Sequence, residues 1–273
     1  MTKYMIEKSR EYPVAKSNTL ARIASTASLY EQRAALYILS KLTKEDTDSY
    51  IANPDVRIKQ VFNLEDFCKV CKMPRGGKTR KEIENALLQL SRPHLQDYEK
   101  EDGNWGTHTV AYLAYANVNY KQGLVLVEMH TAIMPHLLDL RERFIAYELE
   151  QTLSMKSLFS SQLYERLLSF RKNAGTPQQA YYYFEVPDHS IGKMKEFFGV
   201  EGKYKANKDF YRKVLDKAVE EINVMTDLEV TCDRYGRGDN VTVSFDVRYK
   251  ADRHHPSVNM MAEFDKNAKE LKK

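Results

Sequence analysis

The residues best suited to binding chemistry are cations grouped at the start of a helix-like stretch. Lys208, Arg212, Lys213 and Lys217 fall on one arc of the run from Lys208 to Met225. The opposite arc holds apolar residues three or four positions apart, which predicts an amphipathic helix. Lys and Arg side chains neutralise phosphates, and a well-placed Arg can read a base edge. The spacing therefore predicts a helix with a basic face for a polyanion.

The charges on this helix run against its dipole. Asn207 is the predicted N-cap, cations crowd the first half, and Glu220, Glu221 and Asp227 lie in or beyond the second half. Cations near a helix N-terminus cost stability, but the arrangement suits a recognition helix whose N-terminal end enters a DNA groove. A basic surface that is simply solvated remains the alternative interpretation.

Further cations lie on both sides of the helix. Lys203 and Lys205 precede it, and two stretches with alternating apolar residues follow it. That alternation predicts two strands, and the glycine-rich turn between them carries Arg234 and Arg237. We expect this turn to project as a wing that contacts phosphates.

An earlier helix shows the same placement of charge. It is predicted to begin at Thr79, where Thr79 and Glu82 have the spacing of a capping box. Cations at or near its start are again explained by a phosphate backbone. The candidate DNA contacts in this part of the chain are Arg75, Lys78, Arg80 and Lys81.

Two motifs that could bind a nucleotide or a metal are incomplete. Gly77-Lys78-Thr79 resembles the end of a phosphate-binding loop, but Lys72 occupies the position of the required first glycine. Cys68-x-x-Cys71 has a metal-like or redox spacing, yet a zinc site needs two more ligands and no second Cys or His pair has the spacing of zinc ligands. Buried core cysteines are the preferred interpretation, and we predict neither a cofactor nor a metal site.

A nicking nuclease is also disfavoured. Such enzymes use a His-hydrophobic-His metal pair with a tyrosine nucleophile, and the chain has no such pair. The histidines considered are His94, His108, His130, His136, His189 and the adjacent pair His254-His255. Because no nucleophile, base and orienting group can be assigned together, we predict a protein that is not an enzyme.

The elements that must position these cations follow one order twice. The first half reads as helix, helix, turn, helix and hairpin between Ser28 and His130, with Ser28 and Glu31 as a capping box. The second half repeats that order up to the basic helix and its wing. This predicts an α+β fold of two tandem winged-helix domains, inferred from element order because no residue-level repeat is visible.

We expect four segments along the chain. They are a flexible N-terminal arm over 1–17, an N-terminal winged-helix domain with a connecting helix over 18–150, a C-terminal winged-helix domain over 151–250, and a polar tail over 251–273. The stretch 43–55 is acidic and ends at Asn53-Pro54, which is a loop signal. Met134 to Phe144 is predicted to be helical and to continue toward Leu153.

The composition of the chain is compatible with a two-domain DNA-binding protein but does not by itself establish one. The chain has 273 residues, is 42% hydrophobic and carries a net charge of +4, which allows two cores and an anionic partner. It has three cysteines and no apolar run long enough to span a bilayer. We expect a cytoplasmic protein that does not engage the membrane.

Several stretches together resemble one family, the initiator replication proteins of theta-replicating bacterial plasmids. These are Lys16-Ser17-Asn18, Leu29-Tyr30-Glu31-Gln32-Arg33, Met134 to Glu148, Leu163-Tyr164-Glu165-Arg166-Leu167-Leu168, Asp209-Phe210-Tyr211-Arg212-Lys213-Val214-Leu215, Ile222-Asn223 and Thr226-Asp227-Leu228. Their order and spacing cover most of residues 16–250.

The resemblance implies a plasmid initiator that binds repeated origin sequences, called iterons, and promotes origin opening. It implies base reading by the C-terminal winged helix, over the Lys208 to Lys217 face, and backbone contacts and dimerisation through the N-terminal one. The expected partners are double-stranded DNA, a second copy of the chain, the host replication initiator, a helicase and chaperones. The dimer is expected to repress the protein's own gene, with the hairpin Val110 to His130 as its interface.

Two other functions remain open from the sequence. A winged-helix transcriptional regulator would use the same DNA face without initiating replication, and would normally couple it to an effector or oligomerisation domain. A rolling-circle nicking enzyme would instead cleave single-stranded origin DNA with a metal ion. The second winged-helix pattern disfavours the regulator, and the missing histidine pair disfavours the nicking enzyme.

Overall fold

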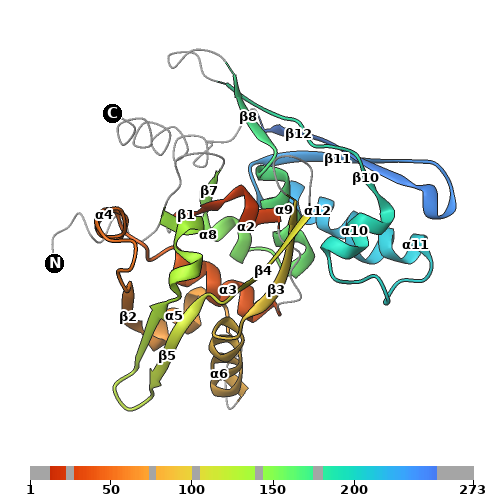
Figure 1. Ribbon diagram of the computed structural model, residues 1–273. Helices are drawn as coiled ribbons and strands as arrows, with labels where there is room; N and C mark the ends of the chain where they lie inside the picture. The colour runs from red at the N-terminus through yellow and green to blue at the C-terminus, as the bar shows by residue number, and fades with distance from the viewer. Residues whose placement is uncertain are drawn as a thin grey trace. The chain divides into compact units, whose positions relative to one another are not determined.

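The computed structural model describes residues 13–22, 28–73, 78–99, 105–138, 144–174 and 181–250. These residues divide into two compact units (Figure 1). The described part of unit 1 spans 13–19 and 28–153, and that of unit 2 spans 20–22 and 154–250. Residues 20–22 thus belong to the second unit, whereas the sequence placed them in the first. The predicted tail over 251–273 and residues 1–12 of the predicted arm lie outside the described residues.

Four helices give unit 1 its framework: α3 (Leu29–Leu39), α4 (Lys44–Ala52), α5 (Leu64–Val70) and α6 (Lys78–Leu90). The Ser28–Glu31 capping box that starts α3 is confirmed. The acidic stretch, for which no helix was predicted, forms α4, which begins with a second capping box between Thr43 and Asp46 and buries no residue. The loop signal at Asn53-Pro54 coincides with the end of α4. Sequence periodicity missed α4 because a helix without a buried face has no apolar stripe.

The sheet of unit 1 has three antiparallel strands: β2 (Lys59–Asn63), β5 (Leu113–Asn119) and β6 (Leu124–Met129). Their spatial order is β2-β6-β5, so the second strand of the β5–β6 hairpin is central. Tyr37 of α3 packs with its ring centroid 5.2 Å from those of Phe62 and Phe67, which joins α3 to β2 and α5 in one core.

Two further strand pairs complete unit 1, and they correct two predictions. One pair is β3 (His94–Glu99) with β4 (Trp105–Val110). The other is β1 (Pro13–Ser17) with β7 (Phe144–Glu148), paired from Pro13↔Glu148 to Ser17↔Phe144. The end of the predicted arm is therefore a strand. Of the predicted long helix from Met134, the described residues keep α7 (Pro135–Leu138) and α8 (Leu149–Leu153), with β7 before α8. The short 3-10 turn η2 (Thr131–Ile133) precedes α7.

Both errors have one cause. The partners in the β1–β7 pair are more than 120 residues apart, so their pairing is a long-range contact that local periodicity does not report. Phe144, Ile145, Ala146 and Tyr147 are all buried. A short continuous apolar run of this kind is compatible with a helix or with a buried strand.

Unit 2 begins with α9 (Leu158–Leu168) and ends with a long hairpin (Figure 1). Its helices after α9 are α10 (Ile191–Phe197), α11 (Asn207–Phe210) and α12 (Asp216–Met225), with a π-helical turn η3 (Tyr211–Leu215) and a 3-10 turn η4 (Gly238–Asn240). Its strands are β8 (Arg171–Ala174), β9 (Tyr181–Phe184), β10 (His189–Ser190), β11 (Leu228–Tyr235) and β12 (Thr242–Tyr249). The predicted strand alternation at the end of the chain is confirmed, since Leu228, Val230 and Val243 are buried.

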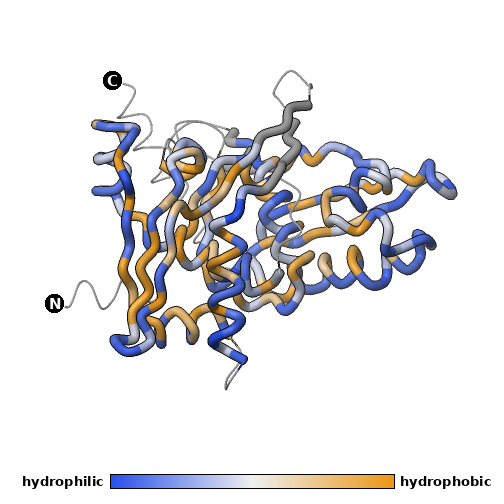
Figure 2. The backbone as a smooth tube through the Cα atoms, turned by 60° about the horizontal axis from the view of Figure 1, so that its bottom comes forward, coloured by the Kyte–Doolittle hydropathy of each residue, from blue (hydrophilic) through white to orange (hydrophobic). Residues whose placement is uncertain are grey.

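The two units share one layout. Each places a helix, a strand, two helices and a hairpin in that order, and the sheet orders β2-β6-β5 and β10-β12-β11 correspond strand by strand. In each unit the helix before the hairpin is the candidate recognition helix, and the hairpin is the wing. Figure 2 shows hydrophilic residues (blue) at hairpin turns and hydrophobic residues (orange) along the strands behind them. The prediction of two tandem winged helices is confirmed.

Polar contacts fix both ends of α9. Arg22 of α2 (Asn18–Arg22) donates from Nε to Ser169 Oγ at 2.8 Å and from Nη2 to the Ser169 carbonyl at 2.7 Å. At the other end the Glu221 carboxylate accepts from the backbone N–H groups of Lys156 and Ser157. These bonds satisfy groups that a helix terminus leaves open, and the Glu221 bonds tie α9 to α12.

Buried His189 makes unit 2 sensitive to acid. Its Nε2 has no hydrogen-bond partner within the part of the chain that the structure describes, and Phe170 lies 6.1 Å from its ring. Burial, and then the positive charges of Arg166 and Lys193, lower the pKa of His189 from 6.5 to about 4.

The unfolded chain protonates His189 at a higher pH than the folded protein does, so we expect the stability of unit 2 to fall as the pH drops from 6.5 toward 4. Unfolding of wild type and His189→Gln at pH 7.0, 5.5 and 4.5 checks this. The same pH slope in both proteins would contradict it.

Candidate nucleic-acid interface

The recognition helix of unit 2 runs without a break through α11, η3 and α12. Phe210, Val214, Ala218 and Ile222 are at most 1% exposed, which confirms the predicted apolar stripe apart from its last member, Met225, which is only half-buried. The middle turn, Tyr211–Leu215, is π-helical. A π turn inserts one extra residue, so side chains before and after it are rotated relative to a regular α-helix, and such turns often occur at functional sites.

The basic side chains predicted for this helix lie on its exposed side. Lys208, Arg212, Lys213 and Lys217 are all exposed. Arg212 Nη2 lies 3.2 Å from Asp209 Oδ1, and Lys213 Nζ lies 3.5 Å from the same oxygen. Exposed ion pairs of this kind are weak, so they orient the two cations without making them unavailable to a ligand. Lys208 and Lys217 form no polar contact with any residue that the structure describes.

The wing of unit 2 carries two arginines with different surroundings. Arg234 forms an ion pair with Asp216, and its guanidinium lies 4.6 Å from the centre of the Tyr211 ring. Arg237 is exposed and has no polar partner among the described residues. The wing thus presents Arg237 freely, whereas Arg234 is held against the recognition helix.

The tip of this wing depends on Gly236. Its φ is +93°, and a Cβ at this position would collide with the carbonyl oxygen of Asn240. Only glycine combines this conformation with such a close approach. The turn that displays Arg237 is therefore specified by a local residue.

Asn207 differs from its prediction. The N-cap position belongs to Ala206, which makes no side-chain capping bond. The Asn207 amide instead accepts from Lys195 Nζ at 2.7 Å and donates to the carbonyl of Gly238 at 2.7 Å. It connects α10, the start of α11 and the wing. The nearby candidates Lys203 and Lys205 are exposed and have no polar partner in the described part of the chain.

The recognition helix of unit 1 is α6. Ile83, Leu87 and Leu90 lie three or four positions apart and are buried, which gives the helix one apolar side. Lys78, Arg80 and Lys81 are exposed in its first turn. The helix begins at Lys78 rather than after Thr79, so the predicted Thr79 capping box is wrong. Arg75 lies outside the described residues.

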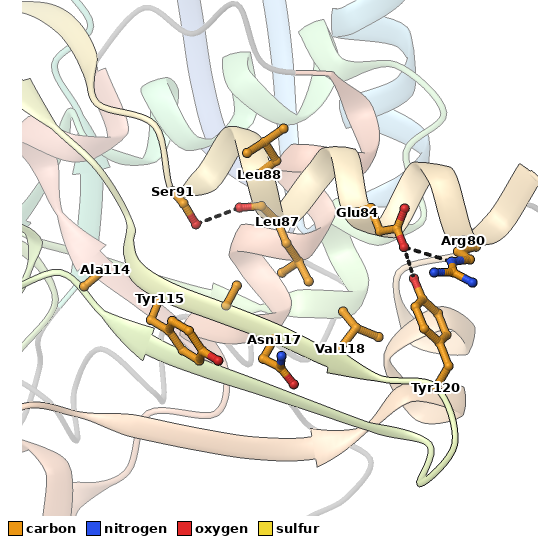
Figure 3. Close-up of a pocket in the computed structure, with 11 residues that line it drawn as sticks. Arg80, Glu84, Leu87, Leu88, Ser91, Ala114, Tyr115, Asn117, Val118 and Tyr120 are labelled. Carbon is orange, nitrogen blue, oxygen red and sulfur yellow. Dashed lines mark hydrogen bonds and ion pairs between the residues drawn. The ribbon is translucent and has the colours of Figure 1, made fainter.

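Arg80 is tied to the wing of unit 1. Its Nε lies 2.9 Å from Glu84 Oε1, and the Tyr120 hydroxyl donates to the same oxygen at 3.0 Å. The Arg80 guanidinium also lies 4.4 Å from the centre of the Tyr120 ring. Figure 3 shows Arg80, Glu84 and Tyr120 next to one another. These residues stand at one end of a groove between α6 and β5, whose lining includes Leu88 and Tyr115.

The predicted contact residues thus form two sets, one in each unit. Unit 2 gathers the cations of α11, η3 and α12 with those of its wing, and unit 1 gathers the cations of α6. Each set combines a helix, which the major groove of DNA can admit, with a projecting hairpin. A winged helix uses this arrangement to contact a groove and the phosphates beside it.

Other chemistry finds little support in the described residues. Burial raises the pKa of Cys71 well above its usual range, and it also raises that of Cys68. Both are free thiols. Over the part of the chain that the structure describes, three or more His, Cys, Asp or Glu side chains do not gather as a metal site would require. The same part contains no helix with the length and apolar character needed to cross a membrane.

Sequence reasoning missed the residues that hold the cations in place. They are Glu84, Tyr120, Lys195, Tyr211 and Asp216. The spacing of Arg80 with Glu84 on one helix face was a visible signal, because residues three or four apart on a helix can pair. The spacing of Asp209 with Arg212 and Lys213 was a second signal of the same kind. The other partners lie on different elements, and their spacing in the chain gives no indication of contact.

Comparisons with known proteins agree with this architecture. Residues 13–168 match the family described as "Initiator Replication protein, WH1", and residues 190–247 match "Initiator Rep protein, WH2". An Escherichia coli protein described as "Uncharacterized 27.6 kDa protein" is 23% identical over 225 residues, which cover 81% of this chain and 88% of that protein.

A solved structure has the same fold. It is described as "Crystal structure of Pi initiator protein in complex with iteron DNA". The TM-score is 0.58 at 17% sequence identity, and the match covers 89% of this chain and 99% of the solved chain.

Proposed function

We propose, from the premise that this chain belongs to the initiator replication protein family, that it initiates plasmid replication by binding iterons sequence-specifically. The protein of similar fold was crystallised with iteron DNA, which supports the same class of ligand here. Bound copies would promote opening of the neighbouring duplex and recruit host replication proteins.

The observation that carries this proposal is the pairing of recognition helix and wing in unit 2. Lys208 and Lys217 on the helix and Arg237 on the wing are exposed cations without a polar partner among the described residues. Exposed cations on both elements suit a duplex, because a helix can enter the major groove while a hairpin contacts the adjacent backbone. A solvated basic surface would not require this pairing.

We propose that unit 2 reads bases and that both units contact phosphates. Base reading is proposed for the exposed face of α11, η3 and α12, and phosphate contacts are proposed for Lys203, Lys205, Arg237 and the cations at the start of α6. Arg75 is kept as a proposed phosphate contact, although it lies outside the described residues. In unit 2, the internal contacts of Asn207 and Arg234 favour a positioning role.

The partners beyond DNA are also proposals. A homodimer through the region from Val110 to His130, which would repress the protein's own gene, is supported by exposed apolar side chains on the strands of unit 1. Val61 is 63% exposed, Tyr115 49% and Leu124 37%. We also propose contacts with a host replication initiator, a helicase and chaperones in the bacterial cytoplasm, and a role without catalysis, because the family resemblance implies them.

A binding titration tests the central proposal. We expect the protein to prefer a duplex of the direct repeats that flank its gene over a scrambled duplex, with one copy bound per repeat. Binding should weaken steeply between 50 and 200 mM salt, by about 10³-fold or more if at least six phosphates are contacted. Fluorescence anisotropy at both salt concentrations measures preference and salt dependence together.

The result that would overturn this function is equal affinity for repeats and scrambled DNA at both salt concentrations. Incubation with Mg²⁺ or Mn²⁺ and single-stranded repeat DNA provides the second control. A covalent protein–DNA adduct in that reaction would replace the proposed role with that of a nicking enzyme.

A further inference from the structure

The same three kinds of side chain meet between recognition helix and wing in both units. In unit 2 these are Arg234, Asp216 and the ring of Tyr211. In unit 1 they are Arg80, Glu84 and Tyr120. Each group has an arginine paired with a carboxylate and lying over a tyrosine ring. We call each group a helix–wing clamp.

The two clamps draw their members from different elements. In unit 1 the helix α6 supplies Arg80 and Glu84, and Tyr120 follows β5 in the wing turn. In unit 2 the wing strand β11 supplies Arg234, and the helix supplies Tyr211 and Asp216. The contacts that join helix and hairpin therefore differ in part. In unit 2 the Arg234–Asp216 ion pair and the Arg234–Tyr211 cation–π contact join them. In unit 1 the Arg80–Glu84 pair lies within α6, and Tyr120 joins the hairpin to it through a hydrogen bond to Glu84 and a cation–π contact with Arg80.

A carboxylate in such a place has an electrostatic cost. Asp216 and Glu84 stand among cations on surfaces proposed to approach phosphates, and a negative charge there repels the DNA backbone. Neither clamp is buried enough to add much to folding stability, since the Asp216 side chain is 48% exposed and that of Glu84 is 49% exposed. The clamps are therefore better explained as orienting the wing relative to the recognition helix than as increasing DNA affinity or folding stability.

Other contacts in the two units reinforce this orientation. Asn207 at the start of α11 donates to the Gly238 carbonyl in the wing of unit 2, which gives that wing a second connection to the helix. In unit 1 burial, and then the hydrogen bond to Glu84, raise the pKa of Tyr120 to about 12. The hydroxyl therefore stays protonated at neutral pH and donates to Glu84.

We propose that Asp216 and Glu84 are positioning residues for DNA binding, which hold each wing at a set angle to its recognition helix through Arg234 and through Arg80 with Tyr120. Arg234 acts through the clamp, whereas Arg237 contacts phosphate directly. The claim that the clamps affect DNA binding rests on the proposed function. The claim that they hold each wing against its helix rests on the contacts alone.

The direction in which Asp216→Asn changes DNA affinity distinguishes a positioning role from a purely electrostatic one. Asp216→Asn removes a negative charge, so a purely electrostatic surface would bind DNA more tightly after the change. A clamp predicts weaker binding, because the wing loses its ion pair and the contacts made by helix and wing are no longer formed together. Asp233 of β11 is a matched control: it is exposed on the same wing, and its side chain has no polar partner among the described residues.

The experiment compares wild type with Asp216→Asn, Asp233→Asn, Arg234→Gln and Arg237→Gln. Each is titrated with the repeat duplex and with a scrambled duplex at several salt concentrations, and hydrogen exchange of wing residues 234–241 is measured without DNA. A second set compares Glu84→Gln with Glu82→Gln, since Glu82 lies on the same helix and has no polar partner in the described part of the chain.

We expect Asp216→Asn and Arg234→Gln to weaken repeat binding about fivefold or more, as for coupled neighbouring residues, and to exchange faster in the wing. The salt slope of Arg234→Gln should equal that of wild type, while Arg237→Gln should lose about 0.9 from its slope. Asp233→Asn and Glu82→Gln should bind as well as wild type or better, whereas Glu84→Gln should bind less well.

Wing exchange that is unchanged in Asp216→Asn, or binding that is as tight as wild type or tighter, would overturn the clamp in unit 2. The same binding result for Glu84→Gln would overturn it in unit 1. If wild type itself shows no preference for the repeats, the proposed function fails, and wing exchange still decides whether the clamp exists.

Discussion

Replacing Phe210 by alanine is expected to lower the free energy of unfolding of unit 2 by about 3 to 5 kcal/mol. The Phe210 ring is fully buried in the recognition helix, with ring centroids 6.1 Å from those of Phe198 and Tyr204. Removing it leaves a cavity where α10, the approach to α11 and the π-helical turn meet. The basic face depends on that packing, so binding to the repeat duplex should be lost together with stability.

Tyr235→Ala is the control for Phe210→Ala, because it also removes an aromatic ring from unit 2 but from a side chain that is 59% exposed. Peptide-resolved hydrogen exchange separates the two units, which need not unfold together. We expect faster exchange across α10 to α12 in Phe210→Ala and near wild-type exchange there in Tyr235→Ala. Equal protection of α10 to α12 in both variants would show that the aromatic cluster is not central to unit 2.

Replacing Arg212 by alanine is expected to reduce discrimination between repeat and scrambled DNA by about 1 to 3 kcal/mol, the contribution of one bidentate base contact. Arg212 is exposed on the π-helical turn, and Asp209 holds its guanidinium at 3.2 Å. A guanidinium oriented in this way can donate two parallel hydrogen bonds to a base edge. The measured quantity is the ratio of the two dissociation constants at one salt concentration.

Arg212→Lys tests whether charge or geometry matters. It keeps the positive charge but loses the planar pair of donors, so affinity for scrambled DNA should be retained while discrimination falls. Arg237→Ala should instead weaken both duplexes alike, as expected of a phosphate contact. If Arg212→Lys preserves full discrimination, Arg212 contacts phosphate and another residue reads the bases.

These predictions assign different roles to side chains that carry the same charge. Arg234 and Arg237 stand three residues apart on one predicted hairpin, and both were assigned to phosphate. Only the contacts separate them, since Arg234 pairs with Asp216 and Arg237 is free of polar partners within the described residues. Likewise, Asn207 was expected to cap a helix and contact DNA, but its amide connects α10 with the wing.

The sequence by itself determined the features that rest on local periodicity. The apolar stripe of the basic helix and the alternation of β11 and β12 were readable because they repeat at the period of a helix or a strand. The capping box at Ser28 is a pair of residues three positions apart, and the repeated order of elements follows from these local patterns. The exposed positions of the cations on α6 and on α11 to α12 followed from the same periodicity. Two winged helices could therefore be predicted without coordinates.

Only the tertiary structure decided what depends on residues distant in the chain. Pairing of β1 with β7 replaced a predicted arm and part of a predicted helix, and residues 20–22 joined the second unit. Helix α4 buries no residue and so had no stripe to find. The clamps bring together residues that are 18 and 36 positions apart, on different elements. Such contacts form when elements pack, and no local pattern encodes them, so the sequence located the basic surfaces and the packing showed which of their side chains are held by other residues.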